Sequence, residues 1–197
     1  MLPKGFPLGR LIFFVTMNVH KFNEARRVLA EYSIATAMLK IKASENQDDN
    51  IENIAKASAL DAAKRSHLPV IVEDAGLFID ALNGFPGPYS NYVYRTIGKE
   101  SMLKLLQNYE DRTARFRSVV VFCYHGEILK CFQGIVEGKI AEEIRGRSGF
   151  GFDPIFEPSD VLEQTFGEMS DEEKNKISHR ARAIREFAKW YKQSVDL

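Results

Sequence analysis

Cysteine and long apolar runs are scarce in this chain, and each scarcity excludes a class of protein. Only two cysteines occur among 197 residues, Cys123 and Cys131, which is too few for the disulfide framework of a small secreted domain. We expect both to be reduced, buried thiols of a cytoplasmic protein. No apolar run approaches the roughly 20 residues that span a bilayer. The apolar stretch 11–15 is also too short for a signal peptide, so no membrane partner is predicted.

Net charge is also lacking, because 27 basic side chains balance 27 acidic ones. A protein that binds DNA or RNA needs a basic surface that displaces counterions, so we expect no nucleic-acid partner. A mononucleotide is compatible with this balance, since a local cluster of lysine, arginine and a metal ion can meet its few charges. Repeats and linkers are absent too. We therefore predict a single domain over 11–197, preceded by a flexible tail over 1–10.

Apolar runs and helical periodicity alternate along the N-terminal half. Strands are predicted at 11–15, 34–42 and 69–74, the last ended by Ala75-Gly76, and helices at about 21–32 and 51–66. A loop over 83–88 precedes a helix broken near Gly98, and a hairpin around His125-Gly126 joins strands at 115–124 and 127–136. This order predicts an α/β protein with a mixed, elongated central sheet flanked by helices.

The segment 16–21 lies between a buried strand and the start of a helix. The unpaired N–H groups of a helix N-terminus suit phosphate oxygens. Thr16 and Asn18 could add side-chain donors, and Lys21 brings a full charge. This is not a P-loop, because the glycines and the Lys-Ser/Thr pair are missing. The alternative is an Asn18 N-cap followed by a solvent-facing lysine.

Two acidic residues, Glu73 and Asp74, end the predicted strand 69–74, where α/β proteins commonly bind ligands. Neighbouring strand residues point to opposite faces, so one carboxylate should enter the site while the other faces elsewhere. A carboxylate at this position can hold Mg²⁺ and orient or deprotonate water. The alternative is that two acids simply end a strand and start a turn.

The loop 148–154 carries two aromatic residues separated by glycine, Phe150 and Phe152. Such a pair can clamp a planar base, and Asp153 beside them could accept a hydrogen bond from a base N–H. The alternative is that these aromatic rings only cover the core.

Near the C-terminus, Lys174 and Arg180 can converge on one ligand only if the helix breaks between them, because they are six positions apart. Ser178 is suited to N-cap a new helix. Arg180 would then lie in a first turn, where the macrodipole disfavours a cation. An anionic or carbonyl-bearing ligand would explain this placement. A solvated basic patch is the alternative.

Together these motifs resemble the inosine/xanthosine triphosphate pyrophosphatases, which act on non-standard purine nucleoside triphosphates. The resemblance runs from about Leu11 to near the C-terminus and is most specific in 82–87, 149–156 and 165–180. The stretch 89–98 looks most like archaeal members. The resemblance implies two lobes with the active-site cleft between them, a homodimer, and the reaction NTP + H₂O → NMP + PPi with water attacking the α-phosphorus.

Carried over by position, the resemblance also implies a role for individual residues. Glu45 and Asp74 would bind Mg²⁺, and Asp74 and Lys21 would be catalytic. The implied substrate contacts are Thr16, Met17, Asn18, Val19, His20, Lys21, Lys56, Ala75, Phe150, Gly151, Phe152, Asp153, Lys174, His179 and Arg180. Two positions depart from the family pattern. Met17 stands where many members have glycine, and would crowd the loop if a positive φ were required there. Ala75 replaces a common serine.

Base choice is a hypothesis from hydrogen bonding. A 6-oxopurine offers an acceptor at O6, to which Arg180 could donate, and a donor at N1, which Asp153 could accept; adenine reverses both. Each mismatched polar pair costs about 1–3 kcal/mol, and a site built on such bonds can reject a wrong partner by about 10⁴–10⁵. Two alternatives are a Maf-type pyrophosphatase for pyrimidine or modified nucleotides and a nucleotide-binding protein without turnover.

Overall fold

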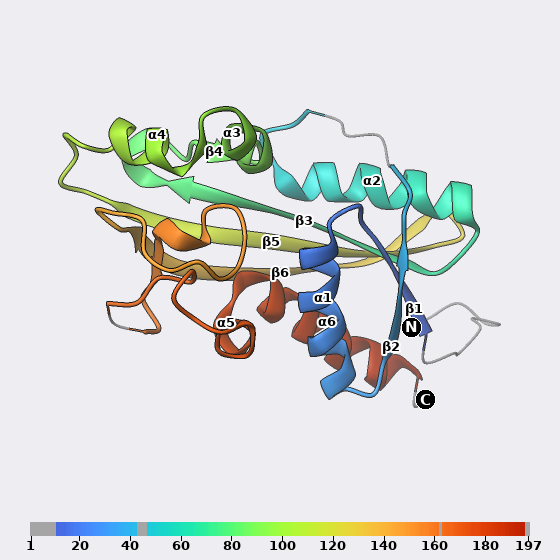
Figure 1. Cartoon of the computed structure of the whole chain (residues 1–197). Coiled ribbons are helices and arrows are strands. Elements are labelled where there is room, and N and C mark those ends of the chain that lie inside the picture. Colours follow the sequence, from blue (N-terminus) through green and yellow to red (C-terminus); the bar gives the residue numbers. More distant parts are fainter. Residues whose placement is uncertain (1–10, 43–46, 162, 196–197) are drawn as a thin grey trace.

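A seven-stranded mixed sheet runs the length of the molecule (Figure 1) in the computed structural model, which describes residues 11–42, 47–161 and 163–195. Its strands are β1 (Leu11–Val15), β2 (Ala35–Leu39), β3 (Val70–Ile79), β4 (Pro86–Gly87), β5 (Thr113–Tyr124), β6 (Glu127–Ile140) and β7 (Phe156–Pro158). The order is β2-β1-β3-β5-β6-β7, with β4 also paired to β3. Pairs β1–β2 and β1–β3 are parallel and the others antiparallel, which confirms the predicted mixed α/β sheet.

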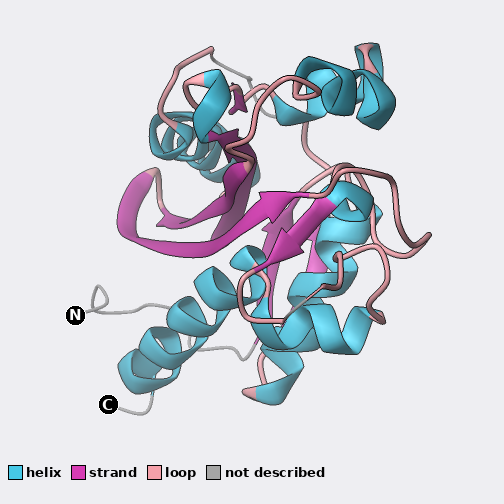
Figure 2. Ribbon diagram, turned by 90° about the vertical axis from the view of Figure 1, so that its left-hand side faces the viewer, coloured by secondary structure: helices cyan, strands magenta, loops and turns pink. Residues whose placement is uncertain are grey.

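Helices lie on both faces of this curled sheet (Figure 2). They are α1 (Val19–Glu31), α2 (Ile51–Ser66), α3 (Ser90–Thr96), α4 (Gly98–Leu105), α5 (Asp171–Ile177) and α6 (His179–Val195). The alanine-rich side of α2 packs on one face, against alternate residues of β3 such as Val70 and Val72. The intervening residue Ile71 faces α1 and α6 on the other side. Helices α3 and α4 and the segment 152–169 cover a further part of that second face, around Leu77.

Strand β3 does not end at Ala75-Gly76, and the sequence prediction on this point was wrong. It continues to Ile79 because β5 pairs with it along its whole length, from Val70 to Ile79. Gly76 serves a close approach and not a turn: a Cβ at this position would lie 2.2 Å from the backbone oxygen of Gly87. Asp74 is therefore in the middle of a strand.

The edge of β3 is nevertheless open beside Asp74. Pairing of β1 with β3 stops at Val15 opposite Val72, and β4 begins to pair only at Leu77. Within the described part of the chain, no strand pairs with this side of β3 over residues 73–76. We call this gap the notch. The first parallel strand ends at the notch, where the chain turns into α1, so the notch lies at the edge where α/β sheets bind ligands.

Three smaller predictions are confirmed: the hairpin turn, the helix break at Gly98 and the register of the two cysteines. The hairpin turns at 125–126, and α3 and α4 are separate helices that meet at Gly98 (φ +75°). Cys131 pairs with Val121 and Cys123 with Ile128, so the two free thiols are out of direct register. Cys123 is buried as predicted, but Cys131 is only half-buried. Burial raises the pKa of Cys123 to about 11. None of the helices over the described ranges is long and apolar enough to cross a membrane. The predicted tail 1–10 lies outside the described residues.

Candidate active site

The segment 16–21 forms the N-terminus of α1, and its cap is local. Asn18 Oδ1 accepts hydrogen bonds from the backbone N–H groups of His20 (2.9 Å) and Lys21 (3.2 Å), and Thr16 Oγ1 accepts one from Asn18 N–H (3.0 Å). Met17 is 63% exposed and is not among the residues with positive φ. Position 17 therefore requires no glycine, and methionine does not crowd the loop.

Lys21 turns away from solvent, against the alternative of a solvent-facing lysine. Its ammonium lies 3.1 Å from Glu73 Oε2. Glu73 Oε1 accepts a hydrogen bond from the Ser118 hydroxyl (2.7 Å) and lies 3.1 Å from Arg180 Nε. Burial opposes ionisation of Glu73, but the charges of Arg180 and Lys21 outweigh it and hold its pKa far below the ordinary value.

Glu24 is a second buried carboxylate, which the sequence reasoning missed. It accepts from Lys174 Nζ (2.7 Å) and Arg180 Nη1 (2.5 Å). Burial alone would raise the pKa of Glu24, but the two cations lower it. A signal was present in the sequence: Glu24 precedes Val28 by four residues and so falls on the buried side of α1.

Lys174 ties Glu24 to the aromatic loop 148–154. Its ammonium donates to Asp153 Oδ2 (2.7 Å), and the same oxygen accepts from the backbone N–H of Phe150 (2.7 Å). The Lys174 ammonium also lies 4.8 Å from the centre of the Phe150 ring. Burial disfavours the ammonium, yet the carboxylates of Asp153 and Glu24 raise the pKa of Lys174 above its usual value. Lys174 is therefore a cation at neutral pH.

The helix break predicted between Lys174 and Arg180 is present. Helix α5 ends at Ile177, and the Ser178 hydroxyl caps α6 by accepting from Ala181 N–H (3.2 Å). The buried guanidinium of Arg180 in the first turn of α6 is offset by Glu24 and Glu73. Protein carboxylates thus already explain a cation at this helix start, without a ligand.

His179 adds a neutral ring beside these charges. Burial, reinforced by the nearby cation of Arg180, lowers its pKa well below the usual value. The ring stacks on Phe116 at 4.6 Å with an angle of 11°. Its Nδ1 is buried and finds no hydrogen-bond partner among the described residues.

Six buried or half-buried side chains therefore form a succession of ion pairs in which cations and carboxylates alternate. We call this succession the charged row. Its members in order are Lys21, Glu73, Arg180, Glu24, Lys174 and Asp153. One end is the 16–21 segment and the other is the aromatic loop. His20 also joins the two ends, because its ring stacks on Phe150 with centroids 5.4 Å apart.

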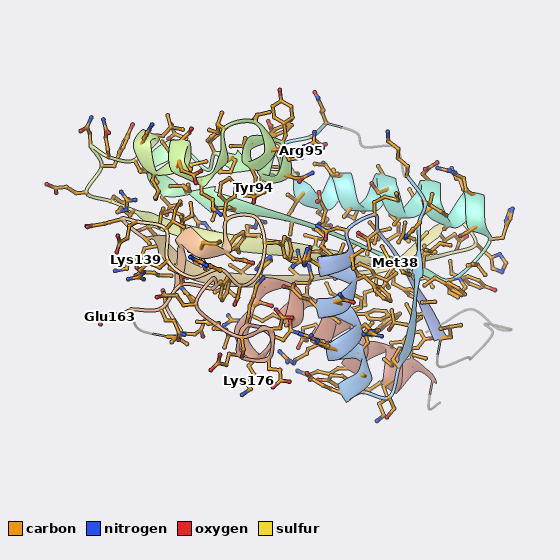
Figure 3. All side chains as sticks on the ribbon, viewed as in Figure 1. Met38, Tyr94, Arg95, Lys139, Glu163 and Lys176 are labelled. Carbon is orange, nitrogen blue, oxygen red and sulfur yellow. The ribbon has the colours of Figure 1, made fainter. Side chains whose placement is uncertain are left out.

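A cavity of about 600 Å³ opens on the outer side of the aromatic loop. Its wall includes Lys99, Arg147, Phe150 and Gly151. Tyr94, labelled in Figure 3, projects from α3 into the same wall, and its ring meets that of Phe152 edge-on at 5.6 Å. Space for a ring-sized group is therefore present next to this loop.

The remaining predicted residues lie apart from the charged row. Asp74 follows Val72 by two residues and so points to the α2 face, opposite to Glu73; its Oδ1 accepts from the Ala75 N–H (2.9 Å). Lys56 projects from α2 and pairs with Glu52 at 2.5 Å. Of the two acids at this strand, Glu73 joins the charged row and Asp74 does not. Glu45 lies outside the described residues.

Asp74 fits a magnesium ion by its chemistry. Over the described ranges, no group of three His, Cys, Asp or Glu side chains gathers to hold a metal. Mg²⁺ commonly retains several waters and uses one or two carboxylates together with substrate phosphates. A half-buried carboxylate beside the notch is sufficient for such a site, and a closed cage is not required.

Comparison with known proteins agrees with this architecture. The Ham1 family model matches residues 12–190. The chain is 50% identical to a dITP/XTP pyrophosphatase of Methanopyrus kandleri over 93% of its own length and 97% of the relative's. It is 49% identical to one of Thermococcus kodakarensis, over 92% and 97%. A HAM1 protein from Coxiella burnetii superposes with a TM-score of 0.80 at 30% identity, covering 93% of this chain and 98% of that one.

Proposed function

The chain belongs to the Ham1 family, and from that premise we propose that it hydrolyses ITP, dITP and XTP to the nucleoside monophosphate and pyrophosphate. The observation that carries the proposal is the charged row. It connects a helix N-terminus suited to phosphate oxygens with an aromatic loop suited to a planar ring. A pyrophosphatase needs both ends in one molecule.

At the phosphate end, Lys21 and the N–H groups of the 16–21 segment would bind the triphosphate tail. Lys56, which projects from α2 and pairs with Glu52, would be a further substrate contact. Asp74, with Glu45, would hold Mg²⁺, which neutralises charge on the phosphate oxygens when bound. Asp74 would also orient the attacking water and accept its proton.

At the base end, Phe150 offers a ring for stacking. Arg180 and Asp153 carry the polarity that a 6-oxopurine requires: a donor for O6 and an acceptor for N1–H. Their protein partners, Glu24 for Arg180 and Lys174 for Asp153, fix these groups in place. Preorganised polar groups reject adenine, because an amino group would face the guanidinium.

The test is a panel of nucleoside triphosphates and deoxynucleoside triphosphates, with products identified, in the presence and absence of Mg²⁺. We expect IMP and pyrophosphate from ITP. The kcat/KM for ATP should be lower by on the order of 10²–10⁴, because two mismatched polar pairs cost about 1–3 kcal/mol each. Asp74→Asn provides the inactive comparison. A preference for pyrimidine nucleotides would favour the Maf-type alternative. Binding without any product would favour a non-catalytic protein, and release of orthophosphate would contradict the reaction.

A homodimer in the cytoplasm completes the proposal. Phe85 (40% exposed), Tyr89 (37%) and Ile135 (37%) place apolar surface around the 83–89 loop. A cavity of about 460 Å³ beside it is lined by Phe78, Asn83 and Ile135 together with charged side chains such as Asp80 and Arg115. Two copies that pair here would cover this surface. Light scattering should give twice the mass of one chain, and Phe85→Asp should give a monomer.

A further inference from the structure

Glu73 lies between Lys21, at the phosphate end of the charged row, and Arg180, the cation to which base recognition is assigned. Its carboxylate has one oxygen 3.1 Å from the Lys21 ammonium and the other 3.1 Å from Arg180 Nε. Among the described residues, Glu73 alone is ion-paired with both cations. Lys21 belongs to the helix N-terminus and Arg180 to the first turn of α6, so two segments far apart in sequence share one anchor.

The carboxylate is held firmly enough to act as a fixed point. Its side chain has no exposed surface, and the Ser118 hydroxyl on the neighbouring strand donates to Oε1 at 2.7 Å. The backbone of Glu73 lies in the ladder between β3 and β5, opposite Val120. The two cations, by contrast, are the ends of long side chains. The Glu73 carboxylate therefore fixes the positions of the Lys21 and Arg180 side chains, and these two side chains do not fix the position of Glu73.

Lys21 shows this dependence most clearly. Its side chain is 20% exposed, while that of Arg180 is 2% exposed and also bonded to Glu24. Without the Glu73 charge, Lys21 has no other ion-pair partner among the described residues. Arg180 would lose one of its two carboxylates and could rotate about its remaining bond to Glu24.

We propose that Glu73 is a positioning residue that aims Lys21 at the phosphates and Arg180 at the base simultaneously. This inference rests on the proposed function, because it assigns those two roles to the two cations. It predicts that a single uncharged substitution weakens both ends of the site together. Loss of an ordinary folding contact would not produce this pattern.

The experiment is calorimetric binding to folded Glu73→Gln in the presence of Mg²⁺, with probes that report on each end separately. Inorganic tripolyphosphate reports on the phosphate end. The ratio of affinities for IMP and AMP reports on the base end. We expect both the tripolyphosphate affinity and the IMP/AMP ratio to fall by on the order of tenfold or more, because each cation loses a buried ion-pair partner.

Two further variants make the result decisive. Ser118→Ala keeps the carboxylate but removes its 2.7 Å hydrogen bond, so both quantities should fall by a smaller factor, roughly 2- to 10-fold. It serves as the test if Glu73→Gln does not fold. Glu157→Gln is the matched control, since this buried carboxylate also lies between two cations, Arg145 at 2.6 Å and Lys139 at 3.1 Å. It should leave both quantities unchanged.

The proposal is overturned if folded Glu73→Gln weakens only one end or neither, or if Glu157→Gln gives the same pattern. These outcomes are distinct from failure of the proposed function. The function fails if the unsubstituted protein releases no pyrophosphate from ITP, whereas the role of Glu73 is read from binding alone.

Discussion

Charged side chains of this protein differ widely in what their pairing contributes, because burial sets the strength of each pair. Arg180 and Glu24 pair with 2% and 9% of their side chains exposed, whereas Arg27 and Asp171 pair with 47% and 53% exposed. Removing one partner of a buried pair costs about 3–5 kcal/mol, because the other charge is left uncompensated. An exposed pair contributes about 0–1 kcal/mol.

Glu24→Gln should therefore lower the free energy of unfolding by about 3–5 kcal/mol, since both Lys174 and Arg180 lose a carboxylate. Urea denaturation followed by circular dichroism measures the change. Asp171→Asn, which breaks the exposed pair with Arg27, should lower it by less than about 1 kcal/mol. Equal losses of unfolding free energy in the two variants would show that the buried ion pairs of the charged row stabilise the fold no more than an exposed pair.

Tyr191 makes stability depend on pH at the alkaline end. Burial raises the pKa of Tyr191 to about 12, against about 10 in an unfolded chain. Its stabilising contribution is complete below about pH 10 and is lost as pH rises toward 12, because only the unfolded state releases the proton in that window. The loss amounts to about 3 kcal/mol.

Tyr191→Phe should remove this part of the alkaline decline, since phenylalanine has no proton to release. The measurement is urea denaturation of both proteins at several pH values between about 9 and 12. Tyr92→Phe, at a position 64% exposed, is the control and should decline like the unsubstituted protein. Parallel curves for Tyr191→Phe and the unsubstituted protein would contradict the assignment.

At the scale of elements, Gly134 on β6 determines how closely α6 approaches the sheet. A Cβ at this position would lie 2.0 Å from the His179 oxygen and 2.5 Å from the Ala183 nitrogen, both backbone atoms of α6. Backbone cannot move aside as a flexible side chain can, so Gly134→Ala must displace the start of α6. That turn carries His179 and Arg180.

We expect Gly134→Ala to lower the free energy of unfolding by at least about 1–3 kcal/mol, as overpacking does, and to reduce the preference for ITP over ATP. Thermal unfolding and the ratio of kcat/KM values measure the two effects. Gln133→Ala is the neighbouring control, because this side chain is exposed. An unchanged nucleotide preference in Gly134→Ala would separate the packing of α6 from base recognition.

The elements with a strong local signal were predicted well. The apolar run 11–15 and the helix 51–66 have the predicted bounds, and Ser178 was identified as the cap between two helices. Strand β3 was predicted too short, because Gly76 reads as a turn residue in the sequence. Only the tertiary contact with Gly87 explains that glycine.

At the scale of the whole molecule, a ligand that bridges both ends of the site should stabilise the entire fold. Lys21 and Arg180 are both held by Glu73 although they come from opposite ends of the chain. With IMP and Mg²⁺ at 100 times the dissociation constant, the free energy of unfolding should rise by about 2.7 kcal/mol. Thermal shift assays measure this, with AMP at the same concentration as the control. An equal shift with AMP would contradict base recognition.

Which residues come together in the candidate site could be predicted from the sequence only in part. Lys21, Asp153, Lys174 and Arg180 lie on the charged row; the substrate contacts that the resemblance implied for them stay a prediction. The two carboxylates that order them, Glu24 and Glu73, were not given this role. Helical periodicity places Glu24 on the buried side of α1. The sequence does not show, however, that cations far along the chain pair with Glu24 and Glu73 and make their burial favourable.

The alternation of β3 also constrains how this protein can change its length during evolution. Glu73 and Asp74 are consecutive, yet one serves the buried cations and the other the opposite face beside the notch. Gaining or losing a single residue between Val70 and Glu73 would exchange the two faces. Insertions should therefore be tolerated in the connecting loops, while the spacing from the start of β3 to this pair of acids stays constant among functional descendants.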